Sequence, residues 1–169
     1  TTGVDVFKND VGRYGVELED NFINTTNGDN GVRFSLTENG TDLNLSMVNN
    51  TVTSAESGVS LNLERSHAIT DLELRENEIN VSGNLNDRAI DLDNSDSVDG
   101  VNMSIDVEAT NNTLESTGTA LFFNTLQNGE GSREIKFANN TIEASDPDAK
   151  GYDVDATGEE LAGHDVVVA

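Results

Sequence analysis

The stretch Asp91–Gly100, which reads DLDNSDSVDG, is a run of side chains that could bind a metal ion. Its Asp93, Asn94, Asp96 and Asp99 supply the hard oxygen ligands that calcium prefers. The spacing lacks the order of an EF-hand loop and its terminal Glu, so a solvated acidic loop is the simpler interpretation. Calcium is the one cofactor for which the sequence offers ligands, and we expect no other.

Acid–base and nucleophilic chemistry have little support among the remaining residues. The chain contains 32 Asp and Glu residues, so carboxylate pairs of the kind that cleave glycosidic bonds arise without functional meaning. His67, in ERSHAITD, is typical of a surface turn, and the absence of Cys excludes disulfides and thiolate metal sites. We therefore expect no catalytic residue.

The formal charge of −23 argues against two classes of partner. Nucleic acid requires Lys and Arg to neutralise its phosphates, and an anionic membrane surface repels an acidic chain. No stretch approaches the roughly 18 apolar residues of a membrane span. The carboxylates indicate either simple solubility or a salt-rich or calcium-rich exterior that shields them.

A repeated motif organises the chain. MVNNTV (Met47–Val52) returns as ATNNTL (Ala109–Leu114) and FANNTI (Phe137–Ile142), with looser copies at LEDNFI (Leu18–Ile23) and LRENEI (Leu74–Ile79). The positions five and three residues before the second polar residue, and two residues after it, are apolar in every copy, although the chain is only 34% hydrophobic. The aligned polar residues are Asn21, Asn50, Asn77, Asn112 and Asn140.

A second set of residues, all small, recurs at intervals of 27 to 31 positions. Each opens an alternating segment such as GVRFSL or GVSLNL, whose apolar side chains share one face of a strand because the pleat has a period of two. No window shows the i, i+3, i+4, i+7 stripe of an amphipathic helix. The small residues are Gly3, Gly31, Gly58, Ala89, Ala120 and Gly151.

Each period therefore predicts three short strands. Strands too short to form a sheet alone pair with their copies in the next period, which predicts an all-β solenoid with three parallel sheets and about five and a half coils of 27–31 residues. Right-handed winding is expected from the usual handedness of parallel crossovers. Residues 1–169 are expected to form a single segment cut from a longer chain, because they begin with a strand and stop within a coil.

The NNTV, NNTL and NNTI turns and the register of small residues resemble the right-handed parallel β-helix of the pectin-lyase-like superfamily. In that family the turn between the second and third sheets often carries a stack of Asn side chains, and the five aligned asparagines match that position. An amide both donates and accepts, so a column of Asn can hydrogen-bond from coil to coil. We expect these asparagines to adopt the left-handed turn conformation and to serve the scaffold.

The resemblance also defines what an enzyme would need. Pectate lyases of this fold use calcium-binding Asp and a basic residue, and the related polygalacturonases use NTD, DD, GHG and RIK motifs. The chain has GHD at Gly163–Asp165 and REIK at Arg133–Lys136, neither of which matches, and it has no NTD and no adjacent DD. A carbohydrate-active enzyme, a polysaccharide lyase or glycoside hydrolase, is therefore the alternative function.

Comparable β-helices form the passengers of bacterial autotransporters and the extracellular parts of large adhesins. By that resemblance we predict an extracellular domain that acts as a rigid stalk or adhesive surface in attachment, aggregation or biofilm formation, tethered to the outer membrane through a part of the chain not present here. Expected partners are glycans or proteins of a host or neighbouring cell, or further copies of the chain. A halophile's surface protein is a third possibility that the acidity suggests; its stability should collapse at low salt.

Eight N-x-S/T triplets have the pattern of N-glycosylation acceptor sites. Three of them arise from the repeated NNT turn, so the fold itself generates such triplets. In a bacterial protein we expect them to be bare, whereas in a secreted eukaryotic or archaeal protein some could be modified, which intact mass would show. They start at Asn24, Asn39, Asn44, Asn49, Asn80, Asn102, Asn111 and Asn139.

Overall fold

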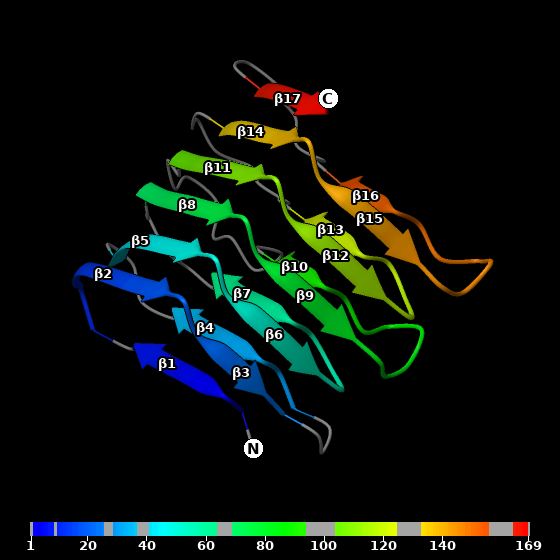
Figure 1. Cartoon of the computed structure of the whole chain (residues 1–169). Coiled ribbons are helices and arrows are strands. Elements are labelled where there is room, and N and C mark those ends of the chain that lie inside the picture. Colours follow the sequence, from blue (N-terminus) through cyan, green and yellow to red (C-terminus); the bar gives the residue numbers. More distant parts are fainter. Residues whose placement is uncertain are drawn as a thin grey trace.

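The computed structural model describes residues 2–8, 10–25, 29–36, 41–63, 69–93, 104–124, 133–155 and 164–168. Within these ranges the chain forms seventeen β-strands joined by turns. The same ranges contain no helix with the length and hydrophobicity needed to cross a bilayer. Figure 1 shows the strands stacked in successive layers along one axis.

The strands form three sheets, which we name A, B and C in the order in which the chain visits them. Sheet A contains β1 (Val4–Lys8), β4 (Val32–Leu36), β7 (Val59–Leu63), β10 (Ile90–Asp93), β13 (Leu121–Asn124) and β16 (Tyr152–Asp155). Sheet B contains β2 (Gly12–Glu19), β5 (Thr41–Val48), β8 (Ile69–Arg75), β11 (Ser104–Thr110), β14 (Arg133–Ala138) and β17 (His164–Val168). Sheet C contains β3 (Phe22–Asn24), β6 (Thr51–Ser54), β9 (Glu78–Val81), β12 (Thr113–Ser116) and β15 (Thr141–Ala144).

Each described strand pairs in parallel with its copies in the neighbouring coils. The described strands make five coils with one strand from each sheet, and β16 and β17 belong to a sixth (Figure 1). The predicted parallel solenoid with three sheets is therefore confirmed, and its coil count slightly exceeds the predicted five and a half. Short strands form here because each gains its hydrogen-bonding partners from the coils before and after it.

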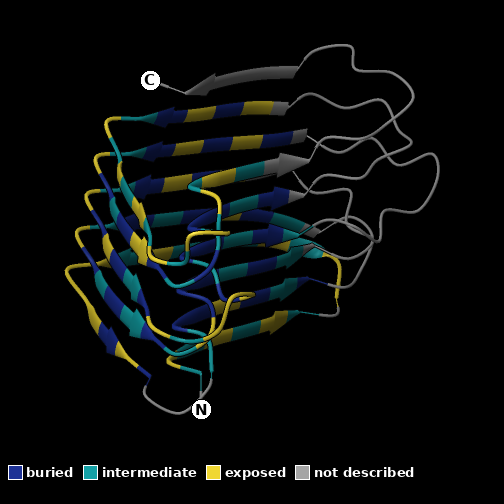
Figure 2. Ribbon diagram, turned by 90° about the vertical axis from the view of Figure 1, so that its right-hand side faces the viewer, coloured by how far each residue is buried: buried dark blue, intermediate teal, exposed yellow. Residues whose placement is uncertain are grey.

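The core lies inside the three sheets and follows from strict alternation. In β4, Val32, Phe34 and Leu36 point inward and are completely buried, whereas Arg33 between them is exposed. Figure 2 shows the same alternation of buried and exposed residues along the described strands of successive coils. Because burying one such side chain stabilises a fold by about 1.5–3 kcal/mol, these apolar columns are the main source of stability.

Gly31 and Gly58 mark places where sheet C passes close to the start of sheet A. A Cβ on Gly58 would collide with Cγ2 of Ile79 and lie 2.6 Å from the carbonyl oxygen of Ala89. A Cβ on Gly31 would lie 2.7 Å from the carbonyl oxygen of Gly58. The register of small residues therefore reflects close approach, and its two alanines, Ala89 and Ala120, are completely buried.

The turn between sheets B and C contains a left-handed residue, but not the one that we predicted. The positive φ, between 54° and 57°, belongs to the residue before each aligned Asn. The ladder side chain has to line up with its copies beside the core, so the sharp change in chain direction occurs one residue earlier, where the side chain points to solvent. These left-handed residues are Asp20, Asn49, Glu76, Asn111 and Asn139.

The connection between the first two strands of the fourth coil is longer than the equivalent connection of the third coil. Residues 94–103 separate β10 from β11, whereas residues 64–68 make the equivalent connection between β7 and β8. The extra length thus falls in the acidic stretch that begins at Asp91, although residues 94–103 lie outside the described part of the chain.

Candidate functional site

Asn50, Asn77 and Asn112 form the buried centre of a column at the turn between sheets B and C, and each is only 1% exposed. The Nδ2 of Asn50 donates to Oδ1 of Asn77 at 3.0 Å, and the Nδ2 of Asn77 donates to Oδ1 of Asn112 at 3.0 Å. Asn21 and Asn140 extend the column, with Nδ2–Oδ1 distances of 3.0 and 2.9 Å to their neighbours. All five aligned asparagines therefore lie in one ladder.

Each buried ladder amide uses both its donor and its acceptor. The Oδ1 of Asn112 accepts from both the backbone N–H and the Nδ2 of Asn77, at 2.9 and 3.0 Å. The Nδ2 of Asn77 also donates to the carbonyl oxygen of Met47 at 2.8 Å. Because a buried polar group without a partner costs roughly 1–3 kcal/mol, this arrangement serves folding. The ladder is scaffold, and a binding site has to be sought on the outer faces.

The outward side chains of sheet B place like charges side by side. Two columns run across β8, β11 and β14, with neighbouring strands about 4.8 Å apart. We call their exposed acids the carboxylate face: Asp71, Asp106, Glu134, Glu73 and Glu108. Like charges directly opposite one another destabilise a sheet, so this face is costly for folding alone.

Two contacts relieve part of that repulsion. Lys136 forms an ion pair with Glu108 across β14 and β11. The hydroxyl of Ser46 donates to the Glu73 carboxylate at 2.9 Å across β5 and β8. Both contacts lie in the same column, so the neighbouring column of Asp71, Asp106 and Glu134 carries the denser charge.

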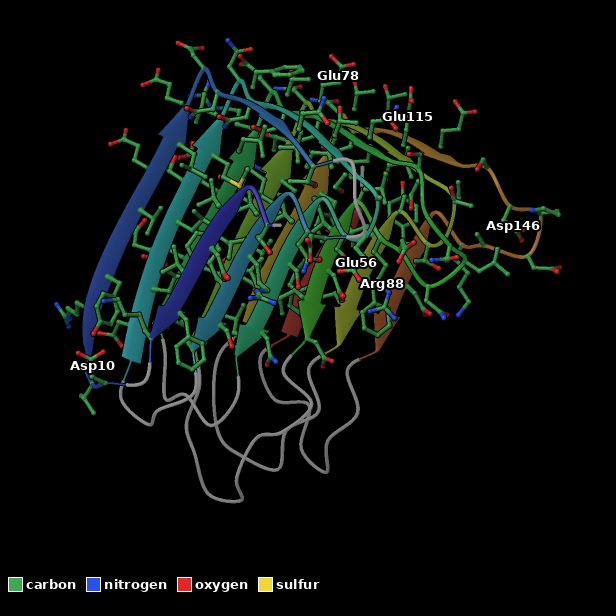
Figure 3. The ribbon with its side chains drawn as sticks, turned by 90° about the horizontal axis from the view of Figure 1, so that it is seen from below. Asp10, Glu56, Glu78, Arg88, Glu115 and Asp146 are labelled. Carbon is green, nitrogen blue, oxygen red and sulfur yellow. The ribbon has the colours of Figure 1, made fainter. Side chains whose placement is uncertain are left out.

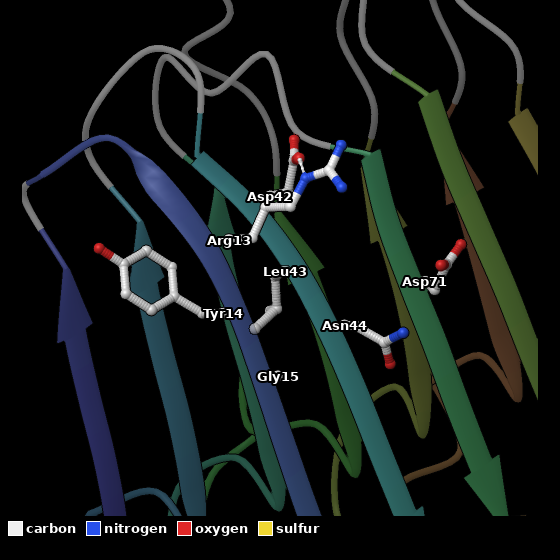
Figure 4. Close-up of a pocket in the computed structure, with 7 residues that line it drawn as sticks. All are labelled: Arg13, Tyr14, Gly15, Asp42, Leu43, Asn44 and Asp71. Atoms are coloured by element: carbon white, nitrogen blue, oxygen red, sulfur yellow. Dashed lines mark hydrogen bonds and ion pairs between the residues drawn. The ribbon is translucent and has the colours of Figure 1, made fainter.

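A shallow hollow of about 350 Å³ lies on sheet B next to the carboxylate face (Figure 4). Gly15 leaves it open, because a Cβ added there would meet no heavy atom within 4 Å. The Nε of Arg13 donates to Asp42 at 2.9 Å along one edge. The side chains of Asn44 and Asp71, in register on β5 and β8, make no hydrogen bond or ion pair within the described chain.

The lining of this hollow combines three kinds of hydrogen-bonding group. Arg13 supplies donors, Asp71 supplies acceptors, and the amide of Asn44 supplies both. A ligand that carries several hydroxyl groups presents the same mixture, because each hydroxyl both donates and accepts. The hollow over Gly15 is therefore a candidate site for a polyhydroxylated ligand such as a saccharide.

The outer face of sheet A differs, because three of its acids are paired with nearby cations. Arg33 contacts Asp5 at 2.7 Å, and Arg88 contacts Asp91 at 2.6 Å. Lys150 contacts Asp153 at 2.9 Å. These three acids belong to one outward column, which passes through β1, β10 and β16. Charge on sheet A is thus balanced locally.

The two arginine pairs of sheet A show how burial decides the sign of a pKa shift. Burial raises the pKa of the Asp91 carboxyl, although Arg88 acts in the opposite direction. The hydrogen bond from Arg33 lowers the pKa of Asp5, whose side chain is 41% exposed against 22% for Asp91. Arg88 also stacks on Phe122, with 3.4 Å between its guanidinium carbon and the ring centroid.

Sheet C offers a weaker candidate. Its outward Glu78 and Glu115 reach into solvent (Figure 3), and Asn80 donates to Glu115 at 2.8 Å. A hollow of about 180 Å³ lies beside Glu115 and Glu143. Its lining residues include no Lys or Arg, so it cannot offer the charged donor that the hollow over Gly15 has.

Of the predicted calcium ligands, Asp93 alone lies within the described residues. It ends β10 on the outer side of sheet A, in register with Asn62 of β7. Asn94, Asp96 and Asp99 fall outside those residues, so the calcium site stays a prediction. Across the described ranges, no three His, Asp or Glu side chains are arranged to hold a metal ion.

The segments that were compared with polygalacturonase motifs lie on neighbouring coils. Arg133 of REIK is in register with His164 of GHD, across β14 and β17. His67 lies outside the described residues. The predicted absence of catalytic residues remains a prediction.

Sequence analysis missed two features of the outer surface. Gly15 interrupts the alternating strand GRYGVELE, and a Gly within a strand often marks an open or closely approached position. The open position could therefore have been predicted from the sequence. The stacking of Arg88 on Phe122 could not be predicted from the sequence, because it joins the residues before one strand to a strand of the next coil.

Comparison of the chain with models of protein families, with curated proteins and with solved structures finds no match.

Proposed function

We propose that the chain is an extracellular, cell-surface β-helix domain that works as a rigid adhesive surface. Its contact point is the hollow over Gly15, and its ligand is a glycan of a host or neighbouring cell. The solenoid supplies rigidity, and sheet B supplies the surface. Catalysis has no part in this proposal.

The observation that carries the proposal is the pair formed by Asn44 and Asp71. Both side chains are exposed on rigid strands, and neither has a partner within the described chain. They face the open volume above Gly15, beside the guanidinium of Arg13 (Figure 4). Polar groups held in place by strands need little reordering when they bind, which favours recognition of a hydroxyl-rich ligand.

The electrostatics of sheet B also bear on the kind of glycan. The carboxylate face lies next to the hollow, so a neutral or cationic saccharide is favoured over a polyuronate. An acidic polysaccharide would meet repulsion from Asp106 and Glu134 along the same column. This preference separates an adhesive surface from the acidic substrates of pectate lyases.

The test measures binding of the purified chain to an array of neutral, amino and acidic glycans. Gly15→Tyr closes the hollow with a residue that favours strands, so we expect at least a tenfold loss of affinity for the best neutral or amino ligand. Thr53→Tyr, at an outward position of β6 on sheet C, adds the same side chain elsewhere and should bind as the wild type does.

The proposal fails if folded Gly15→Tyr binds as tightly as the wild type, or if the folded wild type binds no glycan. Thermal melts establish folding for both variants. New reducing ends or unsaturated products from the bound glycan would instead favour the carbohydrate-active enzyme.

A further inference from the structure

The left-handed residues at the turn between sheets B and C form a row on the outside of the solenoid, beside the buried Asn ladder. All five are exposed. Successive members stack closely, since the backbone N–H of Asn111 donates to the carbonyl oxygen of Ala138, next to Asn139, at 3.1 Å. The row consists of Asp20, Asn49, Glu76, Asn111 and Asn139.

The residue two positions after each member of this row follows a simple pattern. Where the left-handed residue is Asn, it is followed two residues later by Thr51, Thr113 or Thr141. Where the left-handed residue is Asp20 or Glu76, Phe22 or Glu78 stands there instead. The five positions begin equivalent strands of sheet C.

The fold accounts for the two Asn residues of each NNT turn, but not for the Thr. The ladder requires the second Asn of each NNT, and a left-handed turn favours the first. Neither requires Thr, because Phe22 and Glu78 begin the same strand without it. Thr occurs at the start of the strand only where the left-handed residue two positions earlier is Asn. An Asn followed two residues later by Thr is the pattern that N-glycosylation recognises.

The side chains of Asn111 and Asn139 are available for such chemistry. Both are exposed, and neither makes a hydrogen bond or ion pair within the described chain. In contrast, the Nδ2 of Asn49 donates to Asp20 at 2.6 Å. The partner hydroxyls belong to Thr113, which is half-buried, and Thr141, which is exposed.

We propose that Asn111 and Asn139 are acceptors of N-linked glycans. In this reaction the Asn Nδ2 forms a bond to the anomeric carbon of a lipid-diphosphate-linked oligosaccharide, under an oligosaccharyltransferase. The bond from that carbon to the diphosphate oxygen breaks, lipid diphosphate leaves, and the amide nitrogen loses one proton. The inference rests on the extracellular location proposed above, because this transfer occurs outside the cytoplasm.

The consequence is a division of the surface. Glycans at Asn111 and Asn139 cover the edge between sheets B and C at the fourth and fifth coils. The hollow over Gly15 lies on sheet B across the first three coils, away from these two asparagines. A glycan is bulky and solubilising, so glycans at these two positions block lateral association along that edge.

The test is peptide mass spectrometry of the chain isolated from the outer surface of the cells that naturally produce it. We expect glycan mass on the peptides that contain Asn111 and Asn139. Finding both asparagines bare on surface-exposed protein overturns this inference and leaves the adhesive function untouched. If the protein carries both glycans but binds no glycan ligand, the adhesive function is overturned and the glycosylation inference stands.

A pair of matched variants, produced in the same cells, identifies the acceptor sites. Thr113→Val keeps the β-branched shape and removes the hydroxyl, so the glycan at Asn111 should be lost. Thr113→Ser keeps the hydroxyl and should keep that glycan. Asn111→Asp uses the residue type that Asp20 places at the same turn, so it should fold and lack one glycan. Retention of the glycan mass in folded Thr113→Val contradicts the assignment.

Discussion

The Asn ladder and the carboxylate face are both columns of similar side chains stacked in register, yet they have opposite consequences. An amide is complementary to its own copy, because its Nδ2 donates and its Oδ1 accepts, and the ladder repeats that bond four times. A carboxylate accepts only, so a column of Asp71, Asp106 and Glu134 repels itself. Stacking coils therefore stabilises a column of polar side chains only where the repeated side chain can hydrogen-bond to its own copy.

The comparison also separates scaffold from function. The ladder is buried and its hydrogen bonds are internal, so it holds the coils together. The carboxylate face and its neighbouring hollow are exposed and leave polar groups without internal partners. A residue column that weakens folding while facing solvent is where a binding role has to be tested first.

The largest effect is expected when one asparagine of the ladder is replaced by a carboxylate. Asn77→Asp removes the donor to Met47 and Asn112 and places a charge among acceptor oxygens, so we expect a loss of more than about 4 kcal/mol at neutral pH. Asn77→Ala should lose about 2–4 kcal/mol, because it leaves partners unsatisfied without adding a charge. Chemical denaturation measures both.

The pH dependence of the stability of Asn77→Asp tests whether the buried charge causes the loss. Burial raises the pKa of the introduced acid in the folded state, so the penalty should be least below about pH 4 and grow as pH rises. Asn44→Asp makes the same chemical change on the exposed face, where solvent screens its repulsion from Asp71, so it should cost less than about 1 kcal/mol. Equal losses at the two positions would refute the distinction between the columns.

The second prediction concerns the close approach between sheet C and the start of sheet A. Gly58→Ala should cost about 1–3 kcal/mol, because the new methyl group collides with Ile79 and crowds the Ala89 carbonyl oxygen. Gly15→Ala should cost nothing, because its methyl group enters open solvent over the hollow. Thermal melts of the two variants decide whether the interior tolerates less change than the outer face.

The third prediction compares two ion pairs on sheet A. Arg88→Met leaves the half-buried Asp91 without its cation and removes the stacking on Phe122, so we expect a loss of about 1 kcal/mol. Arg33→Met should have a smaller effect, because solvent screens Asp5. If the Arg33 variant were the less stable one in urea denaturation, burial would not control the strength of these pairs.

The fourth prediction concerns repulsion on the carboxylate face. Asp106→Asn removes one charge between Asp71 and Glu134 and adds a donor, so Tm should rise by about 1–3 °C at low salt. The gain should shrink as salt screens the charges that remain. A gain that persists at high salt would mean that repulsion is not its cause.

The smallest effect is the pH dependence of sheet A itself. The lowered pKa of Asp5 contributes stability above the ordinary value of 3.8, and this contribution is lost as pH falls through the folded pKa. The raised pKa of Asp91 acts in the opposite sense, because stability declines as pH rises through its ordinary value. Asp5→Asn should therefore lower stability near neutral pH and have little effect in acid. Asp91→Asn should remove the decline of stability with rising pH that Asp91 causes. Thermal melts at several acidic pH values measure both.

The alternating strands and the thirty-residue repeat were sufficient to predict the parallel solenoid, its three sheets and the five ladder residues. A period of two determines which side chains face inward, and the repeat determines which ones meet their copies in the next coil. The hollow was only half visible in the sequence, as a Gly within an alternating strand. The calcium candidate remains a prediction, because three of its four residues lie outside the described chain.

The sequence alone thus determined the architecture, since inward alternation and repetition are local properties of the chain. Tertiary structure decided which residue of each turn adopts the left-handed conformation and which outward side chains become neighbours. The physical reason is that the coils differ in their number of residues and the connections between strands differ in length accordingly. The register between neighbouring strands is therefore fixed only when the coils stack. That register places Asn44 beside Asp71 over the gap at Gly15, although 27 residues separate the first two in the chain.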